Sequence, residues 1–253
     1  KHKLLMKFAR FMVNFAPPTT YTVFAGEGSS KSLCDHIAFS GVRKVLVVTD
    51  KQLVRLRIVQ KAIAGLKPAG VEFVLFDDVT PDPNYFVVNV GKVKYQASGC
   101  DGLLAVGGGS AIDAAKVIGI AVSHPKHPQE YVGFGKAKEE IPPLFAIPTT
   151  AGTGSEATMG AVISDNDTKE KGIISGRNLL PRAACIDPTL MVGMPKLNTA
   201  ATGMDALTHA IEAYISKWER GDSREKAAAA VKLIFRTLLK VVDAQGASDV
   251  GRV

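Results

Sequence analysis

The stretch Ala105–Lys116, which reads AVGGGSAIDAAK, decides the fold of this chain. An apolar run ends at Val106, three glycines follow it, and a helix-forming run begins at Ser110. Glycine lacks a Cβ atom, so the backbone of such a turn can lie very close to a ligand or to another segment. A strand that enters a helix through glycines is typical of the turns that bind nucleotides in α/β proteins.

Short apolar runs alternate with amphipathic runs on both sides of this turn. The runs predicted to be strands are Lys44–Asp50, which is almost wholly apolar and rich in β-branched residues, Val71–Val79, Asp101–Val106, Pro142–Thr150 and Arg182–Pro188. The runs with helical spacing are Leu53–Leu66, Tyr85–Ser98 and Ser110–Val122. Wholly apolar strands are buried on both faces. This order therefore predicts an α/β fold with a doubly wound parallel sheet and right-handed crossovers.

The pattern changes after Thr150. Residues Gly160–Ser175, GAVISDNDTKEKGIIS, contain two extended segments around a polar turn, which predicts a hairpin. From Pro195 onward we find only helical patterns, over Thr202–Ile215 and from a D-x-x-E cap at Asp222 to about Val242. The second half of the chain is therefore predicted to become helical.

The shift in pattern predicts a domain boundary near Gly193. An α/β domain would occupy residues 1–193, and the start of an all-helical domain would occupy residues 194–253. The 253 residues are 46% hydrophobic and 22% charged, which provides enough apolar material for one large or two modest cores.

The composition argues against several classes of protein. Three cysteines lie far apart without a C-x-x-C pair, so we expect neither a disulfide framework nor a thiolate zinc site, and a reducing cytoplasm fits best. The net charge is +7, but the cations are scattered rather than gathered into a stripe with aromatic residues. We therefore expect no nucleic-acid partner.

The first fifteen residues, KHKLLMKFARFMVNF, predict a basic amphipathic helix. Such a helix can lie on a membrane surface or pack on its own domain, and we favour packing. Lys7 and Arg10 interrupt the apolar run that a signal peptide requires. No stretch approaches the ~20 apolar residues that a bilayer span needs, so we expect no membrane span.

The turn at Gly107–Ser110 is the first candidate site. Free N–H groups and the helix dipole at the start of a helix attract anions, and glycines let the main chain approach a pyrophosphate. The alternative is a tight turn closed by a capping box, for which the S-x-x-D pattern of Ser110 and Asp113 fits. Three glycines exceed the needs of a turn, which favours phosphate.

Two further polar features follow predicted strands. Asp50 stands at a strand end, where it could accept hydrogen bonds from a ribose diol or cap the next helix. The segment Ile147–Thr158, IPTTAGTGSEAT, could line a polar ligand cleft or form a flexible loop. Both alternatives stay open for each feature.

The segment TGMDALTHAIEAY carries Asp205 and His209 four residues apart. On a helix the two side chains project from one face about a turn apart. A carboxylate and an imidazole in this arrangement can share a divalent metal, or they can form a hydrogen bond on the helix surface.

Taken in order, the motifs VLVVTD, GGGSAIDAAK, AIPTTAGTGSEAT, ACIDP and MPKLNTAATGMDALTHAIEAYIS resemble the iron-containing (group III) alcohol dehydrogenases, from about residue 19 to residue 245. This resemblance implies a dinucleotide-binding α/β domain followed by a helical metal-binding domain, with the cofactor and a divalent metal in the cleft between them. It also implies the interconversion of alcohols and aldehydes with a nicotinamide cofactor.

The resemblance carries over to individual residues. The positions that match the pyrophosphate turn and its motif are Gly107, Gly108, Gly109, Ser110 and Asp113. The other positions that match cofactor contacts are Asp50 at the adenosine ribose, Thr149, Thr150 and Thr153 along the nicotinamide half, and Lys171. Asp50 implies NAD rather than NADP. Asp205 and His209 match the first two metal ligands, with iron the expected metal and zinc a chemically plausible one.

Two features depart from the family. Asp82 stands where many relatives have Asn before Pro, which would alter a contact on the ribose side. The family also takes two more histidine ligands from later helices, whereas no histidine follows His209 here. We therefore expect a chain truncated before the second half of the metal-binding domain, or a truncated paralogue.

These observations predict an NAD-dependent, metal-assisted oxidoreductase that interconverts a small primary alcohol and its aldehyde. The alternatives are an NAD-binding module without catalysis and a polyol oxidoreductase similar to glycerol dehydrogenase. The expected partners are the small alcohol or aldehyde and further copies of the chain, since apolar surface left by truncation would favour a homo-oligomer.

Overall fold

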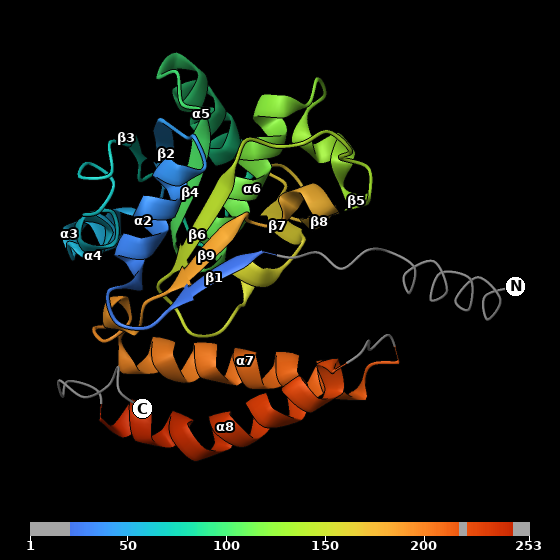
Figure 1. Cartoon of the computed structure of the whole chain (residues 1–253). Coiled ribbons are helices and arrows are strands. Elements are labelled where there is room, and N and C mark those ends of the chain that lie inside the picture. Colours follow the sequence, from blue (N-terminus) through green and yellow to red (C-terminus); the bar gives the residue numbers. More distant parts are fainter. Residues whose placement is uncertain (1–20, 218–221, 245–253) are drawn as a thin grey trace, which may run out of the picture.

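A six-stranded parallel sheet forms the centre of the computed structural model, which describes residues 21–217 and 222–244 (Figure 1). Its strands are β1 (Thr22–Ala25), β2 (Lys44–Val48), β3 (Glu72–Phe76), β4 (Gly102–Gly107), β6 (Leu144–Pro148) and β9 (Ala183–Ile186). Their order across the sheet is β1-β9-β6-β4-β2-β3. The helix expected over the first fifteen residues lies outside the described residues.

The strand order confirms the predicted doubly wound fold. Every neighbouring pair in this sheet is parallel. The chain runs outward from β2 to β3, returns to β4 on the other side of β2, and then continues through β6 toward the opposite edge. Ligands of such sheets bind at the carboxyl ends of the strands where the order reverses, which here lie at β2 and β4.

Helices cover both faces of the sheet, so the strands are buried on both sides. On one face α2 (Ser29–Phe39) and α4 (Ile58–Ala62) contribute to one apolar cluster; on the other, α5 (Tyr85–Ala97) and α6 (Gly109–Ser123) contribute to a second. Successive residues of β4 alternate between the two clusters. This double burial explains why β4 lacks the polar alternation of a half-exposed strand.

The helix predicted over Leu53–Leu66 is wrong in detail. The segment forms two short helices, α3 (Lys51–Arg55) and α4, separated by Arg57 in a left-handed conformation with φ 59°. Apolar spacing continues through the break because Leu53 and Ile58 still pack against the same cluster. Strand β1 and helix α2, which the patterns did not predict, complete one edge of the α/β layer.

The predicted hairpin is confirmed as part of a second, three-stranded sheet. Strands β7 (Gly160–Ser164) and β8 (Lys171–Ser175) pair antiparallel, and β5 (Gly133–Phe134) adds in parallel to β8. Short 3-10 helices complete the connections at Pro128–Tyr131, Ser155–Ala157, Arg177–Leu179 and Pro188–Leu190.

Two long helices follow the sheet and pack against each other below it in the view of Figure 1. Helix α7 (Lys196–Ile215) begins earlier than predicted, directly after Pro195, and α8 (Ser223–Asp243) begins at the predicted position. Asp222 is the N-cap residue of α8, but its carboxylate pairs with Lys226 at 2.9 Å instead of capping the helix. The division of domains at residue 193 stays a prediction.

Within residues 21–217 and 222–244, no helix combines the length and the apolar character that crossing a membrane requires.

Candidate cofactor and metal site

The glycine turn, Gly107–Ser110, connects β4 to α6 at the carboxyl edge of the sheet. Gly107 has φ +155°, and a Cβ atom there would lie 2.7 Å from the Cβ atom of Ala111. Gly108 is the N-cap residue of the 15-residue helix α6. The turn therefore requires glycine at its first position for both conformation and space.

Two threonines lie against the other glycines. A Cβ atom at Gly108 would lie 3.3 Å from the Thr150 side chain, and one at Gly109 would lie 3.0 Å from the Thr153 side chain. Both threonines belong to the threonine segment, Thr149–Thr158, which follows β6. Packing against protein thus accounts for part of the glycine content of the turn.

The amide groups of the turn stay available. In the part of the chain that the structure describes, the N–H groups of Gly108, Gly109 and Ser110 donate to no protein acceptor. The capping-box alternative is wrong, because the carboxylate of Asp113 binds elsewhere and the N-cap position belongs to Gly108. Free amides at the start of a long helix are suited to bind an anion.

Two adjoining cavities meet at Gly109 and Ser110. The acidic pocket, of about 620 Å³, includes Asp50, Asp77, Asp78 and Thr150 among its lining residues. The histidine pocket, of about 520 Å³, is lined by Asp113, Thr153, Lys171, Asp205 and His209 among others. Thr149 lines a smaller cavity that also contacts Asp50 and Gly108. The fold thus gathers the residues singled out from the sequence around one turn.

Asp50 caps α3 and faces the acidic pocket as well. Its Oδ1 atom accepts a hydrogen bond from the Leu53 amide at 2.9 Å, so the capping alternative is present in the structure. The carboxylate is partly exposed and has a second oxygen. Asp78, at the same pocket, pairs with Lys51 at 2.7 Å. The hydrogen bond from Lys51 to Asp78 raises the pKa of the lysine.

Asp205 and His209 lie one turn apart on α7, as the spacing predicted. The Nε2 atom of His209 is 3.7 Å from Oδ1 of Asp205, and the two side chains are 53% and 43% exposed, respectively. Among the described residues, no third His, Cys, Asp or Glu joins them to form a cluster that could hold a metal. Their chemistry fits two positions of a divalent ion, and the cleft leaves both side chains accessible.

Lys171 reaches across the histidine pocket from β8 to Asp82. Its Nζ atom lies 2.6 Å from Oδ1 of Asp82, and both side chains are more than half exposed. Asp82 has φ 53°, a left-handed conformation that Asp and Asn tolerate better than most residues. Lys171 and Asp82, which the family resemblance brought up separately, therefore form one ion pair.

Lys116 is a buried residue of the site region that the sequence patterns missed. Its side chain is fully buried on α6, behind the histidine pocket. Burial lowers the pKa of Lys116 to about 8, while the charges of Asp113 and Glu156 act in the opposite direction. The ammonium form thus predominates at neutral pH. A single cation within the apolar run AAKVIGI was the available signal.

Asp113 attaches α6 to the hairpin sheet. Its Oδ1 atom accepts a hydrogen bond from the Ser155 hydroxyl at 2.5 Å, and Oδ2 accepts one from the Val162 amide at 2.9 Å. Burial raises the pKa of Asp113, and these hydrogen bonds together with Lys116 oppose that shift. Because both oxygens already bind protein donors, a contact to a cofactor stays a prediction for this residue.

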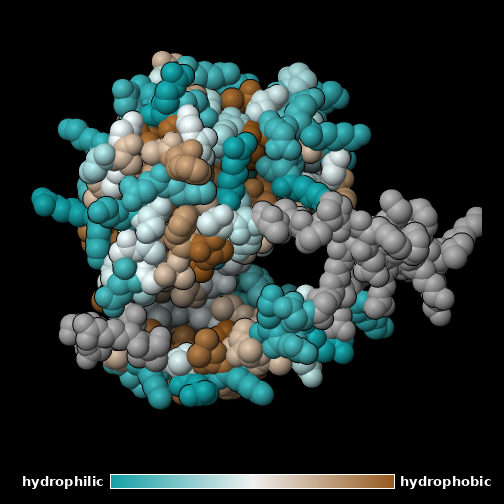
Figure 2. Space-filling view, in the orientation of Figure 1, coloured by the Kyte–Doolittle hydropathy of each residue, from teal (hydrophilic) through white to brown (hydrophobic). Residues whose placement is uncertain are grey.

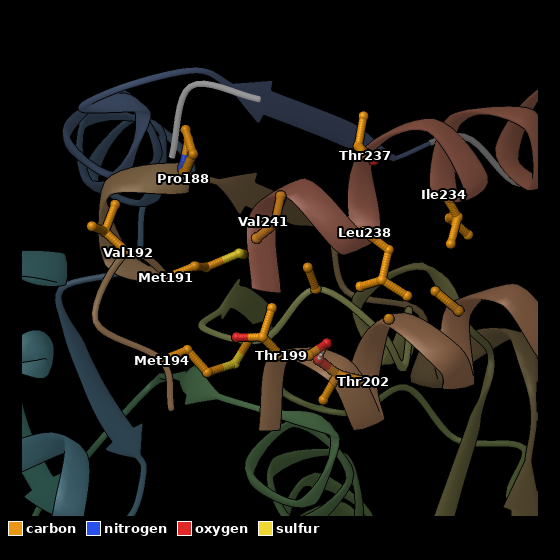
Figure 3. Close-up of a pocket in the computed structure, with 13 residues that line it drawn as sticks. Pro188, Met191, Val192, Met194, Thr199, Thr202, Ile234, Thr237, Leu238 and Val241 are labelled. Atoms are coloured by element: carbon orange, nitrogen blue, oxygen red, sulfur yellow. Dashed lines mark hydrogen bonds between the residues drawn. The ribbon is translucent and has the colours of Figure 1, made fainter. Parts of the chain in front are cut away.

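A separate apolar cavity of about 330 Å³ lies between α7, α8 and residues 188–194 (Figure 3). Met191, Met194, Leu238 and Val241 point into it, and none of the described residues that line it has an ionisable side chain. Figure 2 shows apolar surface at the hollow between the helices and the α/β layer. Its described lining thus offers no charged group for a phosphate or a metal, which favours the glycine turn as the candidate site.

Several known proteins have sequences similar to that of this chain. The chain is 40% identical to the 1,3-propanediol dehydrogenase of Klebsiella pneumoniae over 221 residues, which cover 87% of this chain and 57% of that protein. It is 37% identical to the NAD-dependent methanol dehydrogenase of Bacillus methanolicus over 231 residues, which cover 91% of this chain and 60% of the relative.

A solved structure of 1,3-propanediol oxidoreductase superposes with a TM-score of 0.88 at 38% identity, over 91% of this chain and 60% of that one. The chain thus spans 57–60% of the length of these proteins. A family model for iron-containing alcohol dehydrogenases matches residues 18–188, and the model of the family's C-terminal part matches residues 199–250. The chain belongs to the iron-containing alcohol dehydrogenase family.

Proposed function

We propose that this protein is an NAD-dependent, metal-assisted oxidoreductase that interconverts a small primary alcohol and its aldehyde. The observation that carries the proposal is the set of free amides at Gly108–Ser110, beside a cleft that also contains Asp205 and His209. Relatives whose names describe alcohol dehydrogenases, one of them NAD-dependent, support the same reaction class.

The residues of the turn would bind the cofactor by its charge. The amides of Gly108, Gly109 and Ser110 would donate to the pyrophosphate oxygens, and Asp50 would accept from the adenosine ribose. The three threonines singled out from the sequence would lie along the nicotinamide half. Lys171 would interact with both Asp82 and the cofactor, since Lys171 and Asp82 form an ion pair in the lining of the same pocket.

Asp205 and His209 would hold the divalent metal. Once bound, the cofactor would accept a hydride from the alcohol carbon, and the metal would stabilise negative charge on the substrate oxygen. Affinity order alone does not select iron over zinc, so iron is proposed on the strength of the family. Two protein ligands leave the remaining coordination positions to water, substrate or further side chains.

A non-catalytic NAD-binding module is the second candidate. The observation that favours it is the metal-ligand set, which contains only two residues within the described ranges. Such a module would bind NADH at the glycine turn but would neither retain a metal nor turn over an alcohol.

We also propose a cytoplasmic homo-oligomer. The three cysteines are buried free thiols, as expected in a reducing compartment. Large apolar side chains are exposed on α7 and α8, among them Leu197, Phe235 and Leu239, each at least 70% exposed. Contact with another copy would cover such surface.

A titration followed by an activity assay tests the proposed function. Calorimetry should detect binding of NADH, and addition of Fe(II) or Zn(II) should allow NAD-dependent oxidation of 1-butanol in preference to glycerol. His209→Ala should abolish turnover while leaving NADH binding unchanged. Absence of NADH binding would defeat the proposal, and binding without turnover under any metal would favour the non-catalytic module.

Replacing Asp50 should relax the preference for NAD over NADP. Asp50→Asn keeps an acceptor for the Leu53 amide, so α3 stays capped, but removes the charge that repels a 2′-phosphate. We expect the ratio of NADH to NADPH affinity to fall about tenfold or more, because like-charge contacts cost several kcal/mol. Asp77→Asn, at the same pocket, is the control. An unchanged ratio in Asp50→Asn would move the ribose contact to another residue.

A further inference from the structure

We propose that Lys116 and Asp113 are a positioning pair that fixes the threonine segment over the glycine turn. The proposal deepens the proposed function and rests on it, because the segment lies beside the amides that would bind NAD. It assigns a role to a buried cation that does not line either pocket of the cleft.

The Lys116 ammonium is surrounded by oxygen atoms of one short stretch of chain. It donates to the carbonyl oxygens of Ser155, Thr158 and Gly160 at 2.8, 3.0 and 2.7 Å. The hydroxyl of Thr158 lies 3.0 Å away, and that of Ser155 lies 3.4 Å away. An ammonium has three protons, so these carbonyls satisfy it fully. Without the lysine, each of the three carbonyls would lose its charged donor, although the Ser155 oxygen would keep the hydrogen bond from the Thr158 amide at 3.2 Å.

Asp113 holds the same stretch from the preceding turn of α6. Its two oxygens accept from Ser155 and from Val162, at the start and just beyond the end of the stretch that Lys116 holds. The lysine and the aspartate are three residues apart on the helix, and their charged atoms are 4.0 Å apart. Two side chains of one helix face thus hold residues 155–162, with partners 39–49 residues away in sequence, and the pairing of β7 with β8 adds to this from residue 160 onward.

The fixed stretch continues directly into the threonines that face the glycine turn. Thr153 accepts from the Ser155 amide at 3.3 Å, and its side chain would meet a Cβ atom at Gly109. Thr150 lies against Gly108 in the same way. Helix α6 therefore bears the free amides at its start and, one to two turns later, the pair that sets the position of the segment covering them.

A buried cation suits this role better than an apolar side chain. The other buried residues of α6 are alanine, isoleucine, valine and glycine, which pack without directional preference. Three carbonyls that converge on one ammonium favour a single arrangement of the segment, because a displacement would cost the buried ammonium its hydrogen bonds. A segment fixed before the ligand arrives loses less entropy on binding.

Hydrogen exchange and ligand binding together test the pair. The variants are Lys116→Met, Ser155→Ala as a milder change that removes one of the two Asp113 contacts, and Lys138→Met as a control at an exposed lysine. In Lys116→Met we expect amides of residues 153–162 to exchange about tenfold faster while those of β4 are unchanged. The affinity for NADH should fall about tenfold, and that for AMP, which lacks the nicotinamide half, should not change.

Three outcomes would overturn the proposal. In the first, Lys116→Met and Lys138→Met show the same hydrogen-exchange rates and the same affinity for NADH. Another is a uniform loss of protection with NADH and AMP weakened alike, which would indicate general destabilisation. The third applies if Lys116→Met does not fold: the amides of residues 153–162 then exchange at the same rate in Ser155→Ala as in the unaltered chain. Should the unaltered chain bind no NADH, the proposed function fails, and the exchange pattern still tests whether the pair fixes the segment.

Discussion

Replacing Gly152 with alanine is expected to uncouple α7 from the threonine segment and to lower the proposed alcohol turnover about a hundredfold, as a misplacement of about 1 Å can. A Cβ atom at Gly152 would lie 2.6 Å from the carbonyl oxygen of Thr202 and 2.7 Å from its Cβ atom. Backbone atoms in the middle of a helix cannot move aside as a side-chain end can. Helix α7, which bears Asp205 and His209, and the loop that carries Gly152 must therefore move apart.

The measurement compares Gly152→Ala with Gly193→Ala, at which an added Cβ atom meets nothing within 4 Å. Steady-state kinetics with 1-butanol should show a fall in kcat for the first variant alone, with NADH affinity reduced much less. Hydrogen exchange of α7 amides should increase in the same variant. Equal kcat and equal exchange in the two variants would show that the contact between Gly152 and Thr202 does not set the position of α7.

The second large effect is expected at the glycine turn, where Gly108→Val should weaken NADH binding about a hundredfold or more, given that each charged hydrogen bond contributes ~1.5–3 kcal/mol. Gly108 has φ −79° and ψ −169°, which any residue adopts, so the fold should survive. The valine side chain would stand where the ligand approaches the amides. Calorimetry with NADH, together with circular dichroism, is the measurement.

Displacement of Thr150 is a competing explanation for such a loss, since a Cβ atom at Gly108 would lie 3.3 Å from its side chain. The double variant Gly108→Val/Thr150→Ala separates the two explanations. It removes the collision and leaves the valine over the amides, so the affinity should stay low. Recovery of NADH affinity in the double variant would assign the effect to Thr150 rather than to a blocked pyrophosphate site.

Much of the α/β layer was predictable because its strands are buried on both faces. Val45–Val48 and Leu103–Val106 are wholly buried, and strands covered on both faces must be short apolar runs, which the sequence displays. The break at Arg57 was not predictable, because apolar side chains on both sides of it still face the core. Helix spacing alone cannot detect one left-handed residue.

The site was predictable in its parts and not in its assembly. The i, i+4 spacing of Asp205 and His209 indicated a shared helix face, and the glycines indicated a close backbone approach. The contacts of Gly108 and Gly109 with Thr150 and Thr153 became visible only in the folded structure, because they join segments some forty residues apart. The oxygen atoms that accept from Lys116 likewise belong to a distant segment of the chain, so no local sequence pattern predicts them.

The most direct test of the account is a crystal structure of this chain with bound NADH. We predict pyrophosphate oxygens within hydrogen-bond distance of the Gly108, Gly109 and Ser110 amides, with the adenosine ribose at Asp50. A nucleotide bound elsewhere, or a turn whose amides donate to neighbouring protein atoms in the presence of saturating NADH, would contradict the account.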